Sequence, residues 1–194
     1  MLRQGKMSPK YSGKLDVIVG TFCSEFEYAF KTTLVGGGEE PLYVPSGQSN
    51  RYAKIIFKDD YLASALHEIA HWCIAGSDRR AQMDYGYWYN PDGRTAQQQN
   101  AFLAAEIKPQ ALEWMFSVAC QEGFIISVDN LMGDKKSGST NAFATALVEQ
   151  TTLWCSSTSI PPRGLQFLRA LQYHFGIDAS LSEHYDLRQL TRVI

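Results

Sequence analysis

The chain has 194 residues, of which 45% are hydrophobic, and this length and composition suit one domain with a substantial apolar core. Its formal net charge is −2, so no overall basic field indicates a nucleic-acid partner. The sequence shows neither a signal peptide nor an apolar run long enough to cross a membrane, and we therefore expect a cytoplasmic protein without a membrane partner.

Residues 1–12 are polar and lack periodicity, which predicts a flexible N-terminal extension ahead of a single domain over residues 13–194. The cysteines lie far apart and form no C-x-x-C pair, so we expect reduced thiols in the core and no cysteine-based metal site. These four residues are Cys23, Cys73, Cys120 and Cys155.

The first part of the domain predicts a helix followed by strands. Apolar residues recur at helical spacing over residues 14–33, and the glycines at 36–38 should end this first helix. Residues 42–44 form a short strand candidate, and residues 52–57 are richer in strand-forming side chains. We therefore expect a small sheet directly ahead of the next helix, to which it would give a rigid base.

That next helix, over residues 61–76, contains an H-E-x-x-H pattern. His67 and His71 are four residues apart, so a helix places both imidazoles on one face, where they can bind a single metal ion. Glu68 lies about 100° round the helix from His67. It therefore flanks the predicted metal site without having to be a ligand.

The ends and the opposite face of this helix are also predictable. Asp59 or Asp60 can cap its start, and Gly76 can adopt the left-handed conformation at its end. Apolar residues fall on the side away from the histidines and can pack the helix onto a core. They are Leu62, Leu66, Ile69, Cys73 and Ile74.

Residues 84–94 have an unusual composition, with four aromatic residues in five positions. They predict a strand packed on the core, or else the wall of a pocket. Aromatic rings and carboxylates both attract cations. We therefore expect Tyr85, Trp88, Asp92 and Asp129 to bind a cationic substrate group.

The rest of the chain predicts mainly helices. Thr95 and Gln98 form a capping box that opens a helix, which Pro109 should either kink or divide, with a second helix over residues 109–120. Residues 124–128 are a further strand candidate. The remaining predicted elements are a solvated loop over 129–138, a helix over 142–154, a helix from Pro162 to Gly176 and a short terminal helix after residue 180.

A catalytic metal site needs a third protein ligand and at least one open position. Glu106 is the preferred candidate, because many H-E-x-x-H enzymes place a glutamate on a second helix a few tens of residues later. Glu113 is the alternative, and His174 and His184 lie on ordinary amphipathic faces. Gln110, one turn from Glu106, can orient its carboxylate.

Two imidazoles and one carboxylate suit both zinc and iron. With one open position and a bound water, the site would be a zinc hydrolase centre in which Glu68 is the general base. With two or three open positions, it would be the centre of a non-haem iron oxygenase. The acidic and aromatic surroundings favour a cationic side chain as substrate over an extended peptide.

Several segments together resemble the elongation factor P hydroxylase family (EpmC, also called YfcM). The resemblance extends over about residues 39 to 185, and its first three blocks are distinctive in combination. The segments are Ala63–Gly76, Tyr85–Tyr89 with Pro91–Arg94 and Ala96, Gln97 and Gln99, Glu106–Trp114, Asp129–Leu131 and Phe167–Gln172.

The resemblance implies an α+β, mainly helical fold with a metallopeptidase-like (zincin-like) core and a small sheet beside the H-E-x-x-H helix. It implies that the domain is a metal-dependent hydroxylase of the β-lysylated lysine of translation elongation factor P, using molecular oxygen. The implied metal ligands are His67, His71 and Glu106. The implied metal is Fe(II), with zinc or another divalent metal possible in purified protein.

The resemblance leaves the role of Glu68 open between binding the substrate ammonium group and relaying protons. Two other functions compete with hydroxylation. A zinc metallopeptidase would use Glu68 as its base, and a non-enzymatic binding module would carry a metal closed off by four protein ligands.

Overall fold

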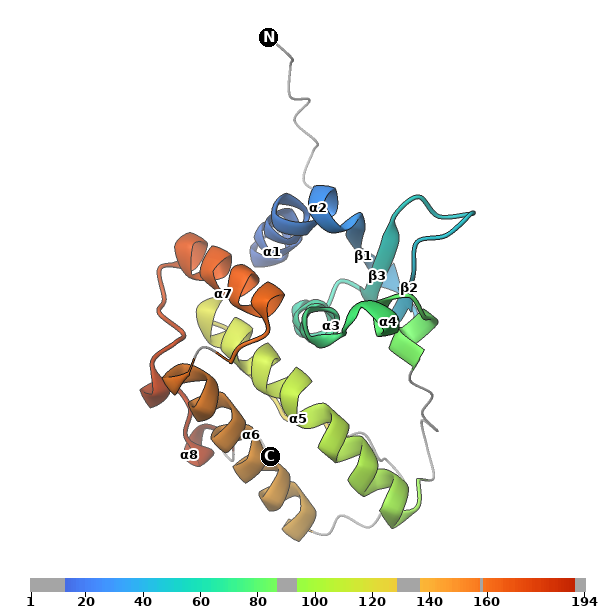
Figure 1. Ribbon diagram of the computed structural model, residues 1–194. Coiled ribbons are helices and arrows are strands. Elements are labelled where there is room, and N and C mark those ends of the chain that lie inside the picture. The colour runs from blue at the N-terminus through green and yellow to red at the C-terminus, as the bar shows by residue number, and fades with distance from the viewer. Residues whose placement is uncertain (1–12, 87–93, 129–136, 158, 191–194) are drawn as a thin grey trace.

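The computed structural model describes residues 13–86, 94–128, 137–157 and 159–190. Most of these residues lie in helices, and a three-stranded sheet packs beside α3 (Leu62–Ile74), the helix that carries the two histidines (Figure 1). The predicted mainly helical fold with a small sheet at this helix is confirmed. Within the described ranges, no helix is both long and apolar enough to cross a bilayer.

The first helical run consists of α1 (Lys14–Phe22), a π-helical turn (Cys23–Glu27) and α2 (Tyr28–Phe30). It ends at Lys31, whose φ of 48° places it in the left-handed region. The prediction of a helix as far as residue 33 was therefore too long. The β-branched residues that follow this turn belong to a strand.

The sheet has the order β1-β3-β2, built from β1 (Thr32–Gly38), β2 (Leu42–Val44) and β3 (Ala53–Lys58). β1 runs parallel to β3, and β2 runs antiparallel to it. The strands at 42–44 and 52–57 were predicted to within a residue, but β1 was missed.

The glycines at the end of β1 were wrongly predicted to end the first helix in a flexible segment. A Cβ atom on Gly36 would lie 2.6 Å from Cζ of Phe57, and one on Gly38 would lie 2.7 Å from Cγ2 of Ile56. These glycines therefore let the strand approach side chains of β3 more closely than any other residue could.

The predicted caps of α3 were wrong at both ends. Tyr61 occupies the N-cap position without a side-chain hydrogen bond, and neither Asp59 nor Asp60 takes that place. Gly76 has an extended backbone, with φ −67° and ψ 173°.

Two guanidinium groups satisfy the last carbonyls of α3 instead. Nη2 of Arg163 donates to the carbonyl oxygens of Trp72, Cys73 and Ala75 at 2.8, 3.0 and 2.6 Å. Arg80 also donates to the Ala75 carbonyl. Cations suit the negative end of a helix dipole, so these arginines fix the end of the helix that holds His71.

A long helix, α5 (Ala96–Ala119), runs through the middle of the molecule (Figure 1). Its predicted capping box is confirmed, since the Thr95 and Gln98 side chains each bond the other's backbone N–H. Pro109 lies in the interior of one continuous helix, so of the two predicted alternatives the division into two helices is excluded. The helix survives a proline there because it is packed against α3, α6 and α7.

The strand predicted over residues 124–128 is absent from the described structure. Side chains of α5 satisfy this backbone in place of a neighbouring strand. The Gln110 amide accepts from N–H of Ser127 at 3.1 Å and donates to its carbonyl at 2.7 Å. Gln99 donates to the carbonyl of Val128 at 2.7 Å. An apolar run alone cannot reveal such a partner.

The last third of the chain is helical, as predicted. α6 (Ser137–Ser156) begins earlier than expected, so the predicted loop is shorter than 129–138, and residues 129–136 lie outside the described ranges. α7 (Pro162–Phe175) ends at Gly176, whose φ is 73°. A 3-10 turn (Ser182–His184) and α8 (Leu187–Leu190) form the short terminal element.

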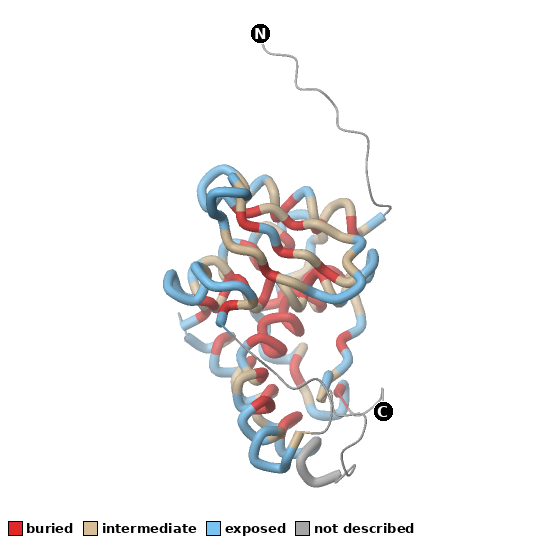
Figure 2. The backbone as a smooth tube through the Cα atoms, turned by 90° about the vertical axis from the view of Figure 1, so that its right-hand side faces the viewer, coloured by how far each residue is buried: buried red, intermediate tan, exposed pale blue. Residues whose placement is uncertain are grey.

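The core centres on an aromatic cluster around Trp72 of α3. The ring of Trp72 lies 5.3 Å from that of Phe22 and 5.0 Å from that of Phe26, and Phe167 of α7 lies 6.1 Å from each of those phenylalanines. Buried residues gather in the interior of the molecule and exposed residues on its outside (Figure 2), and both α3 and α5 carry many of the buried ones. All four cysteines are free, as predicted.

Candidate metal centre

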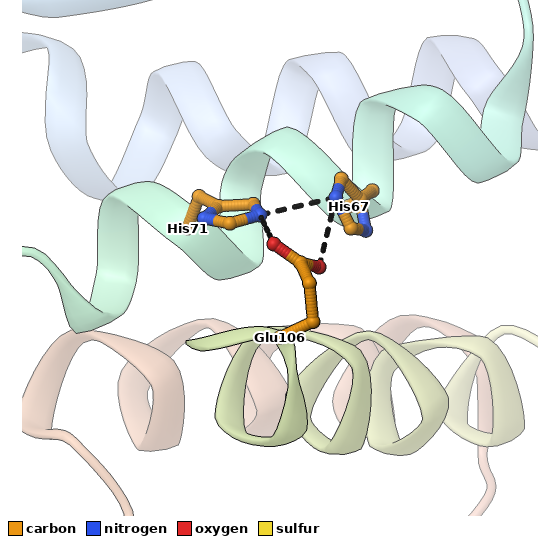
Figure 3. Close-up of side chains that lie close together, drawn as sticks. All are labelled: His67, His71 and Glu106. Atoms are coloured by element: carbon orange, nitrogen blue, oxygen red, sulfur yellow. Dashed lines mark hydrogen bonds and ion pairs between the residues drawn. The ribbon is translucent and has the colours of Figure 1, made fainter. Parts of the chain in front are cut away.

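Three side chains converge between α3 and α5 (Figure 3). Nε2 of His71 lies 3.1 Å from Nε2 of His67 and 3.3 Å from Oε1 of Glu106. Oε2 of Glu106 lies 3.7 Å from Nε2 of His67. The helical spacing in α3 aims the two imidazoles at α5, and the buried Glu106 meets them from the opposite side.

The separations fit a shared metal ion. Ligand atoms at about 2.1 Å from one ion lie about 3.0 Å apart in octahedral geometry and about 3.4 Å apart in tetrahedral geometry. The three separations of 3.1, 3.3 and 3.7 Å are close to this range. Within the described part of the chain, His67, His71 and Glu106 are the group of side chains placed closely enough to bind one metal ion together.

The second carboxylate of α5, Glu113, contacts the centre from outside it. Its Oε2 lies 2.7 Å from Nδ1 of His67, the ring nitrogen that does not face Glu106. A carboxylate here keeps the proton on Nδ1 and leaves Nε2 as the metal-binding atom. Sequence reasoning considered Glu113 only as an alternative ligand. Its position seven residues after Glu106, two turns along the same face, could have indicated this supporting role.

Gln110 lies one turn from Glu106, as expected. Its amide donates to Oε2 of Glu106 at 3.3 Å, and its bonds to Ser127 fix the orientation of that amide. The carboxylate of Glu106 is therefore held by an amide on its own helix while it faces the imidazoles of α3.

The electrostatics of the centre favour a bound cation. Burial by itself would lower the pKa of His67, but the carboxylates of Glu113 and Glu106 outweigh it and raise that pKa from 6.5 to about 10. Burial would raise the pKa of Glu106, but its hydrogen bond with His71 and the nearby imidazoles lower that pKa from 4.5 to about 2. A metal ion at the convergence point would replace the proton that this arrangement attracts.

Glu68 and Tyr85 flank the centre. Burial raises the pKa of Glu68, while the charges of His67 and His71 act in the opposite direction and lower it. The ring of Tyr85 lies parallel to that of His71, with centroids 6.4 Å apart. Tyr85 belongs to a 3-10 turn (Met83–Gly86) and not to the strand predicted for this segment.

The other sequence candidates are not among the residues that form the described centre. Trp88, Asp92 and Asp129 fall outside the described residues. His174 and His184 are on the C-terminal elements and take no part in the metal-binding group.

The chain was compared with known proteins. A model of the family described as elongation factor P hydroxylase, EpmC, matches residues 21–185. The chain belongs to the elongation factor P hydroxylase family.

A curated relative supports the same family membership. The chain is 42% identical over 158 residues to the elongation factor P lysine hydroxylase of Haemophilus influenzae, which covers 81% of this chain and 87% of the relative. The resemblance drawn from the sequence is thereby confirmed. The elongation factor P hydroxylase family is a family of enzymes, and hydroxylation is an oxidoreductase activity.

The contact between Glu113 and His67 leads to a specific prediction for this member of the elongation factor P hydroxylase family. Replacing Glu113 by glutamine keeps a hydrogen-bond acceptor but removes the charge that makes His67 a more basic ligand. We expect metal affinity to fall by about 10- to 100-fold, measured by competition with a coloured chelator. The exposed Glu149 of α6, changed to glutamine, is the matched control, and equal affinities in both variants would contradict the supporting role of Glu113.

Proposed function

We propose that this chain hydroxylates the β-lysylated lysine of translation elongation factor P, using molecular oxygen at a non-haem metal centre. The observation that carries the proposal is the convergence of His67, His71 and Glu106 in a member of this family. The name of the Haemophilus influenzae relative supports the lysine as the modified residue. The peptidase alternative has no comparable support.

We propose Fe(II) as the metal of this centre because it is the metal that the family resemblance implies, with zinc or another divalent ion as the species that purified protein can also carry. A set of two imidazoles and one carboxylate leaves two or three coordination positions open. Bound Fe(II) would supply oxygen activation for insertion of one oxygen atom into an aliphatic C–H bond, while an external two-electron reductant would be needed to convert the other atom of O2 to water.

The chain's own residues orient and tune this centre. Glu113 holds His67 with Nε2 directed at the metal position, and Gln110 holds the carboxylate of Glu106. The buried apolar faces of α3 and α5 limit access of water to the centre, which strengthens every electrostatic contact inside it.

Substrate binding is proposed for the acidic and aromatic residues near the centre. We propose that Glu68, which follows the ligand His67 in the chain, accepts a proton or pairs with the ammonium group of the lysine chain. Tyr85 lies beside His71, and Trp88, Asp92 and Asp129 would complete a site for an extended cation. A folded protein substrate also requires a docking surface around the metal centre. We further propose a zincin-like core for the fold and a cytoplasmic location, where the substrate acts in translation.

The direct test uses elongation factor P that already carries the β-lysyl group. Aerobic incubation with the Fe(II)-loaded full chain and an excess of a chemical reductant should add the mass of one oxygen atom to the modified lysine, read by mass spectrometry of the peptide. The reductant supplies the two electrons that convert the second oxygen atom to water. Unmodified factor and metal-free enzyme are the controls. Failure of the Fe(II)-loaded enzyme to add oxygen would contradict the proposal.

Replacing Glu68 by glutamine separates hydroxylation from hydrolysis. If Glu68 handles a proton or the substrate ammonium group, hydroxylation should fall by about 100-fold or more, while metal content stays that of the unchanged protein. The variant is assayed for added oxygen and, in parallel, for cleavage of unstructured peptides. Wild-type peptide cleavage that disappears in the Glu68→Gln variant, without any oxygenation by either protein, would instead support the peptidase.

A further inference from the structure

Tyr85 is held rigidly beside the candidate metal centre by its ring. Its side chain stacks on Tyr43 of β2, with centroids 4.3 Å apart and an interplanar angle of 16°. It also lies parallel to the His71 ring at 6.4 Å and is only 4% exposed. The ring of Tyr85 is therefore engaged in packing between the sheet and α3.

The backbone around Tyr85 adopts an unusual left-handed conformation, which neighbouring groups hold in place. Asp84, Tyr85 and Gly86 all have positive φ values, of 47°, 57° and 70°. Such values are unfavourable for residues with a Cβ and persist only where the surroundings impose them, often at functional sites. Here the N–H of Tyr43 donates to Oδ1 of Asp84 at 2.8 Å, and Arg79 donates to the carbonyl of Tyr85 at 3.2 Å.

The hydroxyl group of Tyr85 is unpaired within the described structure. It is buried and has no hydrogen-bond partner among the described residues. The stacked neighbour, Tyr43, differs in this respect because its hydroxyl donates to the carbonyl of Arg80 at 2.8 Å. An unpaired buried hydroxyl costs stability, and a phenylalanine would fill the same space without that cost. The structure therefore offers no packing reason for the hydroxyl.

Among the charged groups that act on this hydroxyl, Glu68, the second residue of the H-E-x-x-H pattern, has the largest effect. Burial raises the pKa of Tyr85, and the charge of Glu68 adds to the effect, so the phenol keeps its proton. The side chain of Glu68 makes no hydrogen bond in the described part of the chain. The unpaired hydroxyl therefore belongs to a residue whose ring lies beside that of His71, and Glu68 directly follows the other histidine, His67, in the chain.

We propose that the Tyr85 hydroxyl donates a hydrogen bond to the outer atom of a small ligand that occupies the open coordination position of the centre. Glu68 would face the same ligand as an acceptor. A ligand whose outer atom carries both a lone pair and a proton would satisfy both groups at once. The inference deepens the proposed function and rests on its metal centre.

The test measures ligand binding and not turnover. The full chain is loaded with Co(II), a spectroscopic substitute, and titrated with azide as the probe while the visible absorption is followed. Tyr85→Phe should weaken azide binding by roughly 10-fold, the loss expected for one hydrogen bond to a charged group. Cobalt affinity should not change, because the hydroxyl touches no ligand atom. Tyr43→Phe is the matched control from the same stack and should retain wild-type azide affinity.

Thermal unfolding distinguishes this role from a structural one. Since the hydroxyl has no hydrogen-bond partner in the described part of the chain, Tyr85→Phe should be at least as stable as the unchanged protein. Equal azide affinity in Tyr85→Phe and wild type would overturn the proposal, and so would a loss of cobalt binding in Tyr85→Phe alone. Failure of the wild-type chain to bind cobalt would contradict the proposed metal centre itself, which keeps the two failures apart.

Discussion

Replacing Glu106 by alanine is expected to abolish metal binding and hydroxylation together. Glu106 contributes the carboxylate that contacts both imidazoles, at 3.3 Å from His71 and 3.7 Å from His67. Loss of a residue that only supports a ligand costs about 10- to 100-fold in metal affinity, so loss of the ligand itself should exceed 100-fold. Metal content after dialysis, by atomic absorption, and added oxygen on elongation factor P are the two measurements.

The control for this variant is Asn100→Ala, an exposed position on the same helix, which should bind metal normally. A folded Glu106→Ala protein that still retains one equivalent of metal would show that the carboxylate is not a ligand. The circular dichroism spectrum is needed alongside, because Glu106 is 3% exposed and its removal leaves a space inside the protein.

Replacing Trp72 by alanine should have the largest effect on stability. Its side chain is fully buried among Phe22, Phe26 and Phe30, with ring centroids 5.0 to 5.4 Å away, and the guanidinium of Arg163 lies 4.7 Å from its ring. Truncation of a buried aromatic residue to alanine costs about 3–5 kcal/mol. The free energy of unfolding in urea should fall by that amount.

Tyr173→Ala is the matched aromatic truncation, since Tyr173 is 88% exposed. It should change the free energy of unfolding by less than about 0.5 kcal/mol. A loss below about 1 kcal/mol for Trp72→Ala would mean that the aromatic cluster does not anchor α3. The metal-free protein should be used for both variants, since a bound metal would add its own stabilisation.

Much of the candidate centre could be predicted because it depends on local spacing. A helix turns by a fixed amount per residue, so His67 and His71 share a face wherever α3 lies in the molecule. Glu106 and Gln110 follow from the same rule on α5 once the second helix is placed. The role of Glu113 could not be predicted in this way, because it depends on which ring nitrogen of His67 faces α5.

The errors in the fold share a different physical origin. The glycines of β1 resemble a flexible break, and only the positions of Phe57 and Ile56 explain why they belong to a strand. Residues 124–128 resemble a strand, yet Gln110 and Gln99 take up their backbone hydrogen bonds. The end of α3 is capped by Arg163, ninety residues later. Each of these features depends on tertiary contacts, which no local pattern encodes.

The bonds of Arg163 with α3 bear on when the centre can form during synthesis. Arg163 donates hydrogen bonds to three carbonyls of this helix end and lies over the Trp72 ring. These groups lack their Arg163 partner until α7 has been translated. Phe22, near the start of the chain, packs against Phe167 of α7. Contacts so distant along the chain form late and cooperatively. A nascent chain therefore carries both histidines before Arg163 can fix the end of α3, and we expect stable metal binding only after α7 has been translated.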